Sequence, residues 1–211
     1  MKNKTYIFFV SFLLIFSSFF LFSCGNKENT ENKSMQIQQN NESKNVRNAS
    51  PNATLVSIIK KSKTKKISIW LSIDKKNFTL SVMAGEKQLK TYPVVLGFNE
   101  KDDKRLEGDG CTPEGDFKAL SKYKHAKWSR FIWVNYPTED SERKHQLAKK
   151  EGKIPENATV GSEIGIHGVP NNDDSIIDKY NHWTLGCISL KTAHIIEVYD
   201  VVDKNTRISI K

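Results

Sequence analysis

A strict alternation of apolar and polar residues near the start of the folded region constrains the fold most. Residues 67–73, ISIWLSI, carry isoleucine or leucine at every second position. Residues 78–83, FTLSVM, alternate in the same way after the turn DKKN. Side chains of a strand point alternately to its two faces, so each segment predicts a strand with one buried face. Together the two segments predict a β-hairpin at the beginning of a sheet.

The remaining patterns predict a mainly β domain with short helices. Strands are predicted at residues 90–97, 115–120, 130–134, 162–168 and 206–210, and helices at residues 138–152 and 192–202. Pro93 lacks an amide donor, which indicates an edge strand or a bulge. Thr138 is a suitable N-cap for the first helix, and Gly152 is a suitable stop. The sum predicts a β-sandwich or barrel-like fold.

The N-terminal segment has the organisation of a secretory signal. Two lysines precede residues 6–23, an uncharged run of 18 residues, which is at the lower limit for a membrane-spanning helix. Ser23 is small and precedes Cys24, and LFSC resembles a bacterial lipoprotein signal, in which the cysteine is acylated. We therefore predict a signal peptide at residues 1–23 and a lipid anchor on Cys24, with an uncleaved anchor helix as the alternative. Either arrangement places the rest of the chain outside the cytoplasm, facing the periplasm or the cell wall.

Composition divides the exported chain into two parts. Residues 24–55 are rich in Asn, Lys, Ser, Gln and Glu, so they bury too little apolar surface to offset chain entropy. We predict a disordered tether there, and a single domain with a core at residues 56–211.

The chain is basic, with a formal net charge of +9. Loss of the two signal lysines leaves 31 basic minus 24 acidic residues, or +7. For an exported protein this charge favours attraction to anionic membranes or cell-wall polymers. We expect no nucleic-acid partner, and we expect a monomer.

Chemistry in this chain is predicted to centre on Cys187, within YNHWTLGCIS. Besides Cys24 the chain holds Cys111 and Cys187 and no CxxC pair, which argues against a disulfide framework or a thiolate zinc cluster. A cysteine nucleophile needs a general base and an oxyanion hole. His167, twenty positions upstream at the end of an apolar strand, is a candidate base. The N–H groups of Gly186 and Cys187 are candidate oxyanion donors, and Gly186 lets the backbone approach a substrate carbonyl.

Other roles remain open for the same residues. Cys187 could be a buried structural cysteine, and His167 a satisfied core histidine. His182 could join them in a zinc site, since these are acceptable ligand types. Trp183 could stack on a substrate peptide or sugar, or could simply pack. Cys111 could form an inactivating disulfide with Cys187, and the helix predicted after Cys187 would lower the pKa of its thiol.

Several motifs together resemble one family, the L,D-transpeptidase catalytic domain, or YkuD-type fold. HG at residues 167–168 is similar to its histidine-glycine pair. TLGCI at residues 184–188 is similar to its Ser/Thr-His-Gly-Cys motif. GDGCTPEGDFKA at residues 108–119 resembles its Thr-Pro-x-Gly loop and strand. The resemblance covers about residues 67–210.

The resemblance implies an enzyme, a cysteine L,D-transpeptidase that modifies peptidoglycan stem peptides through an acyl-enzyme thioester. Cys187 would be the nucleophile and His167 the general base. The carbonyl of Gly168 would orient the imidazole. The N–H groups of Gly186 and Cys187, with Thr184 nearby, would hold the oxyanion. No metal and no organic cofactor is expected.

Two departures from the family pattern bear on the direction of the reaction. Leu185 stands where the family has histidine, and Ser189 where it has arginine. WTLGCIS resembles a divergent branch, some members of which hydrolyse cross-links or lipoprotein-peptidoglycan links. We therefore expect hydrolysis to compete with transpeptidation, unless Lys191 or Arg130 replaces the arginine in space. Trp183 and Ser189 are predicted to bind substrate. A catalytically inactive peptidoglycan-binding lipoprotein and a zinc-dependent hydrolase are the remaining alternatives.

Overall fold

The computed structural model describes residues 53–61 and 69–211. The predicted signal peptide at residues 1–23, the lipid-anchor candidate Cys24 and all but the end of the predicted tether lie outside these ranges. In the part of the chain that is described, no helix is both long and apolar enough to cross a membrane.

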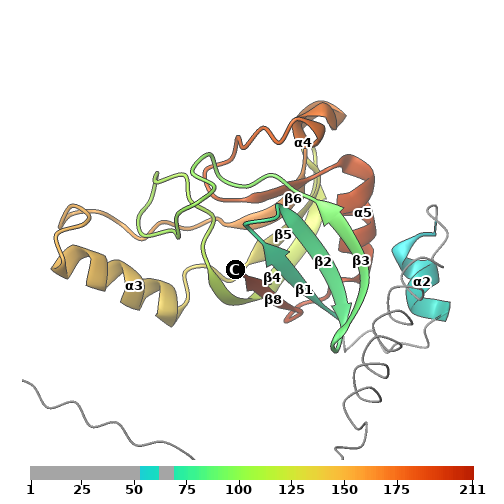
Figure 1. The fold of residues 1–211 in the computed structure, drawn as a ribbon, viewed down its shortest axis with the longest axis horizontal. Helices are drawn as coiled ribbons and strands as arrows, with labels where there is room; N and C mark the ends of the chain where they lie inside the picture. Colours follow the sequence, from blue (N-terminus) through green and yellow to red (C-terminus); the bar gives the residue numbers. More distant parts are fainter. Residues whose placement is uncertain (1–52, 62–68) are drawn as a thin grey trace, which may run out of the picture. The chain divides into compact units, whose positions relative to one another are not determined.

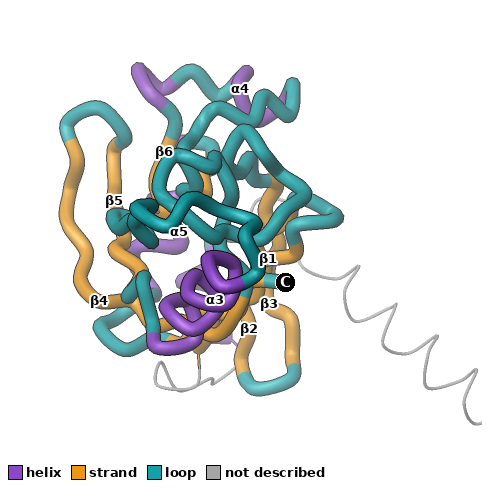
Figure 2. Tube along the Cα trace, turned by 90° about the vertical axis from the view of Figure 1, so that its left-hand side faces the viewer, coloured by secondary structure: helices purple, strands orange, loops and turns teal. Residues whose placement is uncertain are grey.

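Over the described residues, eight strands form one mixed sheet in the order β3-β2-β1-β8-β4-β5-β6-β7 (Figure 1). The strands are β1 (Ile69–Asp74), β2 (Thr79–Ala84), β3 (Lys87–Pro93), β4 (Gly115–His125), β5 (Ser129–Val134), β6 (Gly165–Gly168), β7 (Ile188–Leu190) and β8 (Arg207–Ile210). The β1–β8 and β6–β7 pairs are parallel, and the other neighbours are antiparallel. The long β4–β5 hairpin forms a two-stranded ribbon at one side of the sheet (Figure 2).

The two edges of this sheet meet each other. Val95, just after β3, donates its N–H to the Ser189 carbonyl of β7 at 3.0 Å, and the Ser189 N–H donates to the Val95 carbonyl at 2.8 Å. This bridge closes the sheet, so the predicted mainly β, barrel-like fold is confirmed. Pro93 ends the edge strand β3, as its missing donor predicts.

The described residues also form short helices. They are α2 (Leu55–Lys61), the 3-10 turn η2 (Pro170–Asn172), α3 (Glu139–Lys150), α4 (Ser175–Asp178) and α5 (Thr192–Val201). Thr138 caps α3 as predicted, since its Oγ1 accepts the Ser141 N–H at 3.3 Å. α5 packs on β5 and β6, and α2 packs on α5 and β3. No helix was predicted where α2 lies, and it begins at Leu55, the last residue of the predicted tether.

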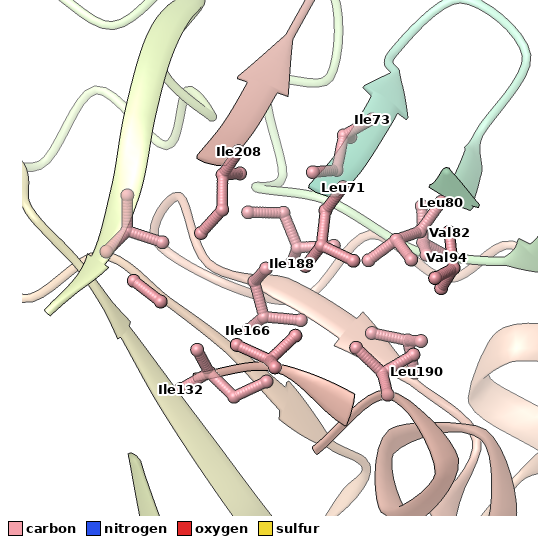
Figure 3. Close-up of a cluster of buried hydrophobic side chains, with 14 of the residues drawn as sticks. Leu71, Ile73, Leu80, Val82, Val94, Ile132, Ile166, Ile188, Leu190 and Ile208 are labelled. Atoms are coloured by element: carbon pink, nitrogen blue, oxygen red, sulfur yellow. The ribbon is translucent and has the colours of Figure 1, made fainter. Parts of the chain in front are cut away.

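The core lies between the two halves of the sheet (Figure 3). Leu71 of β1 and Ile208 of β8 point toward Ile166 of β6 and Ile188 of β7, and all four side chains are buried. Burial of each such side chain contributes roughly 1.5–3 kcal/mol. Alternate residues face opposite sides of a strand, so the residues next to Ile166 and Ile188 in the sequence face the other side of the sheet. That outer face carries the candidate site.

Candidate active site

The parallel pairing of β6 and β7 brings the candidate nucleophile and base to one face of the sheet. His167 lies opposite Ser189 in the register. Cys187, two residues before Ser189, therefore lies beside Gly165, two residues before His167. Side chains at these diagonal positions share a face of the sheet.

The imidazole of His167 is buried, with 1 % of its surface exposed, and is hydrogen-bonded on one side. Its Nδ1 lies 2.8 Å from the carbonyl oxygen of Gly168, which is the contact that the family resemblance implied. With Nδ1–H as the donor, the lone pair is on Nε2. Burial lowers the pKa of His167 to about 4, although the bond to Gly168 opposes this change. The imidazole is therefore neutral near pH 7.

Three aromatic rings surround this imidazole. The Trp128 ring stacks on it with centroids 4.4 Å apart and an interplanar angle of 22°. The Phe131 ring is nearly parallel, at 5.6 Å and 9°, and the Trp183 ring meets it edge-on at 5.6 Å and 70°. Trp183, predicted to bind substrate, is thus half-buried and packs directly against the candidate base.

Two glycines of β6 make this aromatic packing possible. A Cβ atom at Gly165 would lie 2.1 Å from the Phe131 ring, and one at Gly168 would lie 2.6 Å from the carbonyl oxygen of Trp128. No side chain fits at such distances. Gly168 therefore has a packing requirement in addition to the carbonyl that faces His167.

The thiol of Cys187 is bound to backbone in this structure. Its Sγ donates to the carbonyl oxygen of Glu163 at 3.5 Å, and no hydrogen bond joins it to His167 among the described residues. Burial raises the thiol pKa to about 11, and the Gly165 N–H and the Lys104 ammonium oppose the increase. Cys187 is therefore a neutral thiol near pH 7, and it must rotate before it can donate a proton to His167.

The prediction that a following helix lowers the thiol pKa is wrong. Strand β7 separates Cys187 from α5, which begins only at Thr192. The positive end of a helix dipole acts within about one turn. Burial therefore dominates the thiol pKa.

The turn before Cys187 is held by the Thr184 hydroxyl. The Gly186 N–H donates to Thr184 Oγ1 at 3.2 Å, and this hydroxyl donates to the Cys187 carbonyl at 2.7 Å. The Gly186 N–H, a predicted oxyanion donor, is thus occupied in this state. Gly186 has a φ of 134°, and a Cβ there would lie 2.6 Å from the carbonyl oxygen of Cys111. Gly186 therefore lets the backbone come close to the Cys111 carbonyl. The sequence had suggested that this glycine serves the approach of a substrate carbonyl.

The loop that carries Cys111 is fastened by a buried ion pair. Lys104 is 5 % exposed, and its ammonium lies 2.9 Å from Asp109 Oδ1 and donates to the Leu106 carbonyl at 3.1 Å. Asp109 Oδ1 also accepts the Cys111 N–H at 3.0 Å. The Lys104–Asp109 ion pair therefore holds the backbone of Cys111, whose carbonyl oxygen lies close to Gly186.

The family identity follows from a comparison of sequences. The family described as L,D-transpeptidase catalytic domain (YkuD) matches residues 68–210. The chain belongs to this family. A comparison with curated proteins found no match.

Several solved structures are similar to this L,D-transpeptidase family member. A variant of the helical cell shape determining protein Pgp2 from Campylobacter jejuni is 22% identical, with a TM-score of 0.51 over 74% of this chain and 54% of that chain. An L,D-transpeptidase from Mycobacterium smegmatis is 16% identical, with a TM-score of 0.45 over 68% of this chain and 58% of that chain. The present chain thus spans a little over half the length of either protein.

Arg130 and Lys191, the two residues considered as replacements for the family's arginine, contact other side chains. The Arg130 guanidinium lies 5.4 Å from the Tyr199 ring centroid, and Lys191 pairs with Asp178 at 2.5 Å. Ser189, predicted to bind substrate, is fully buried, and its Oγ has no hydrogen-bond partner among the described residues. The cation that acts on the Cys187 thiol is therefore another one, Lys104.

The remaining candidates are separate from this constellation. His182 Nδ1 accepts the Leu96 N–H at 3.0 Å, which gives it a structural role. No group of three or more potential metal ligands occurs in residues 53–61 and 69–211. Cys111 and Cys187 are both free thiols, although the Cys111 loop borders the site.

Sequence reasoning missed Trp128, Phe131 and Lys104. The alternation in RFIWV does place Phe131 on the face opposite to Ile132, but alternation does not reveal which residue it meets across the sheet. For Lys104 the sequence offers only one lysine among many. Its burial and its pairing with Asp109 come from tertiary structure.

Proposed function

We propose that this protein is a cysteine L,D-transpeptidase that acts on peptidoglycan stem peptides through a thioester on Cys187. The observation that carries the proposal is the β6–β7 register, which puts Cys187 and His167 on one face. The free Nε2 of a neutral imidazole beside a thiol is the arrangement that nucleophilic catalysis by cysteine requires.

The reaction begins with a rotation of the Cys187 side chain away from the Glu163 carbonyl. His167 Nε2 then takes the thiol proton while the sulfur attacks the carbonyl carbon of a bond between an L-centre and a D-centre. The tetrahedral intermediate collapses, the C–N bond breaks, and His167 returns the proton to the leaving amine. An amine or water next attacks the thioester and regenerates the thiol.

Negative charge develops on the carbonyl oxygen during this sequence. The Cys187 N–H is our first candidate donor, and the Gly186 N–H joins it if its bond to Thr184 is exchanged. Such preorganised donors are worth roughly 3–4 kcal/mol each in acyl transfer. The Lys104 ammonium adds a fixed positive charge that favours the anionic sulfur. The reaction requires neither a metal nor an organic cofactor.

Hydrolysis of the thioester is the second candidate outcome, and the residues near the turn before Cys187 favour it. Leu185 is 67 % exposed and apolar, so it offers no hydrogen bond to a second peptide. Arg130 and Lys191, the cations considered as holders of an acceptor carboxylate, are engaged elsewhere. A thioester without a well-held amine meets water more often.

A single assay separates these outcomes. A tetrapeptide-bearing muropeptide is offered with excess amine acceptor, and hydrolysed and cross-linked products are measured by mass. A tenfold or larger excess of cross-linked product would exclude dominant hydrolysis. Intact-mass detection of an acyl adduct that is absent in Cys187→Ala supports the thioester. Absence of both adduct and turnover would favour an inactive peptidoglycan-binding lipoprotein.

We further propose that the protein is exported and held on a bacterial membrane by lipid on Cys24, facing the periplasm or cell wall. The support is the uncharged run that ends at Ser23. Intact-mass analysis of the native protein should show an acylated Cys24 at the N-terminus. A mature protein that retains residues 1–23 would exclude this anchor.

A further inference from the structure

An indole ring lies between two imidazoles beside the site. The Trp128 ring stacks on His125 with centroids 4.3 Å apart and an angle of 11°, and on His167 at 4.4 Å and 22°. His125 belongs to β4, His167 to β6, and Trp128 to the turn of the β4–β5 hairpin (Figure 2). Three segments thus contribute one continuous stack.

The hairpin turn holds the indole in this place by hydrogen bonds. His125 Nδ1 accepts the N–H of Lys127 at 3.1 Å and that of Trp128 at 3.2 Å. The Trp128 carbonyl in turn accepts the Gly168 N–H at 3.1 Å. The backbone of Trp128 is therefore hydrogen-bonded both to His125 in its own hairpin and to Gly168, whose carbonyl faces His167.

The stack limits the freedom of His167. The bond from Nδ1 to the Gly168 carbonyl fixes one edge of the imidazole, and the parallel rings of Trp128 and Phe131 lie against it. An imidazole held in this way has little freedom to rotate or to contact water.

We propose that Trp128 is a positioning residue for His167, which keeps the imidazole dry, neutral and aimed at the Cys187 side of the face. The catalytic consequence rests on the function proposed above, whereas the positioning itself does not. His125 serves the same end indirectly, because it holds the turn that carries Trp128.

The sign of the expected change follows from burial. An indole face attracts a cation, which alone would raise the pKa of His167. The pKa is instead lowered to about 4, so burial dominates. The titratable groups that face this imidazole are His125 from the hairpin, which also lowers the pKa, and Cys187 from the turn before β7. Removal of the indole admits water and should therefore raise the pKa of His167.

The test is an NMR titration of the His167 ring in the full chain, with its signal assigned by loss in His167→Gln. Trp128→Leu removes the stacked ring, and Trp128→Phe keeps an aromatic face. Trp70→Leu is the matched control, because Trp70 is also half-buried but lies on β1, where its Nε1 donates to the Gly85 carbonyl.

We expect the His167 midpoint to move from about 4 toward the ordinary value near 6.5 in Trp128→Leu, and to move less in Trp128→Phe. Trp70→Leu should leave the midpoint unchanged. An unchanged midpoint in folded Trp128→Leu overturns the proposal. If Trp128→Leu does not fold, an unchanged midpoint in His125→Ala, which releases the turn, overturns it instead.

Turnover of a stem peptide separates this inference from the proposed function. Trp128→Leu should lower kcat about tenfold with little change in KM, since misplacement of a catalytic group acts mainly on the chemical step. A raised midpoint with normal kcat would remove the catalytic consequence. A chain in which His167→Gln has normal turnover would sink the proposed function, while the titration would still decide whether Trp128 positions the ring.

Discussion

Around His167 the contacts are aromatic rings, whereas behind Cys187 they are buried charges. On the histidine side, Trp128, Phe131 and Trp183 meet the imidazole through ring faces and edges. On the cysteine side, Lys104 and Asp109 hold the neighbouring loop by an ion pair.

A second buried lysine supports the cysteine side. The Lys75 ammonium donates to the Asp102 carbonyl at 2.6 Å, to the Thr112 carbonyl at 3.1 Å and to Glu114 Oε1 at 2.8 Å. The Thr112 hydroxyl accepts the Gly97 N–H at 3.0 Å, so this network reaches the chain that follows the edge strand.

The aromatic contacts around His167 and the ion pairs behind Cys187 should respond differently to mutation and to solution conditions. Ring packing carries no charge at neutral pH, so salt acts on it weakly, whereas protonation of His167 at low pH adds a charge to it. A buried ion pair fails when one partner is removed or neutralised, because the other charge then lacks compensation. The base should therefore remain positioned when removal of one charge of the ion pair loosens the loop behind the nucleophile.

The largest expected effect comes from replacement of Cys187 or His167 themselves. Cys187→Ala should abolish turnover, and His167→Gln should reduce it roughly a hundred- to ten-thousand-fold, the usual worth of a general base. Both variants should keep the fold, as judged by circular dichroism, since each removes few packing atoms. Normal turnover of stem peptides by Cys187→Ala would show that the nucleophile is another residue.

The next effect concerns the stability of the ionic loop. Lys104→Met leaves the mostly buried Asp109 carboxylate without its cation but with its backbone N–H donors, and we expect a loss of about 3 kcal/mol in the free energy of unfolding. The matched control is Asp116→Asn, which breaks the exposed Arg207–Asp116 pair and should cost at most about 1 kcal/mol. Urea titration measures both. Equal losses would mean that burial of the Lys104 pair is unimportant.

A reactivity measurement sharpens the comparison at the thiol itself. With a thiol pKa of about 11, alkylation of Cys187 by iodoacetamide should still rise close to tenfold per pH unit between pH 8 and pH 10. An ordinary cysteine levels off above its pKa of about 8.5. Cys187→Ala corrects for reaction at Cys111. A plateau below pH 9 would contradict a neutral thiol with a raised pKa.

The smallest expected effect is the acid response of the loop. Burial alone would raise the pKa of Asp109, but the Leu106 N–H and the Lys104 ammonium outweigh it, and the pKa is lowered. A lowered folded-state pKa means that the stabilisation is present above the unfolded value near 3.9 and is lost as pH falls through the folded value. On acidification, hydrogen exchange should therefore open the surroundings of His167 first, because its pKa is lowered from about 6.5 to about 4, and the Asp109 loop only below about pH 4. Simultaneous opening would remove the contrast between the two sides.

The sequence by itself determined the local features of this protein. The alternation in ISIWLSI gives β1 its buried face, and Thr138 starts α3 where the capping pattern predicts. The segments HG, TLGCI and GDGCTPEGDFKA together pointed to the family, because its functional groups and their glycines lie in short local motifs.

Only the tertiary structure decided how distant segments meet. The β6–β7 register places Cys187 beside Gly165, and a shift of one residue would turn the thiol to the opposite face. The hydrogen bonding of the Gly186 N–H, the burial of Lys104 and the stacking of Trp128 on His167 likewise join segments or atoms that no local pattern relates. The physical reason is that periodicity and capping act within one element. Register and side-chain packing depend on every element that contributes to the contact.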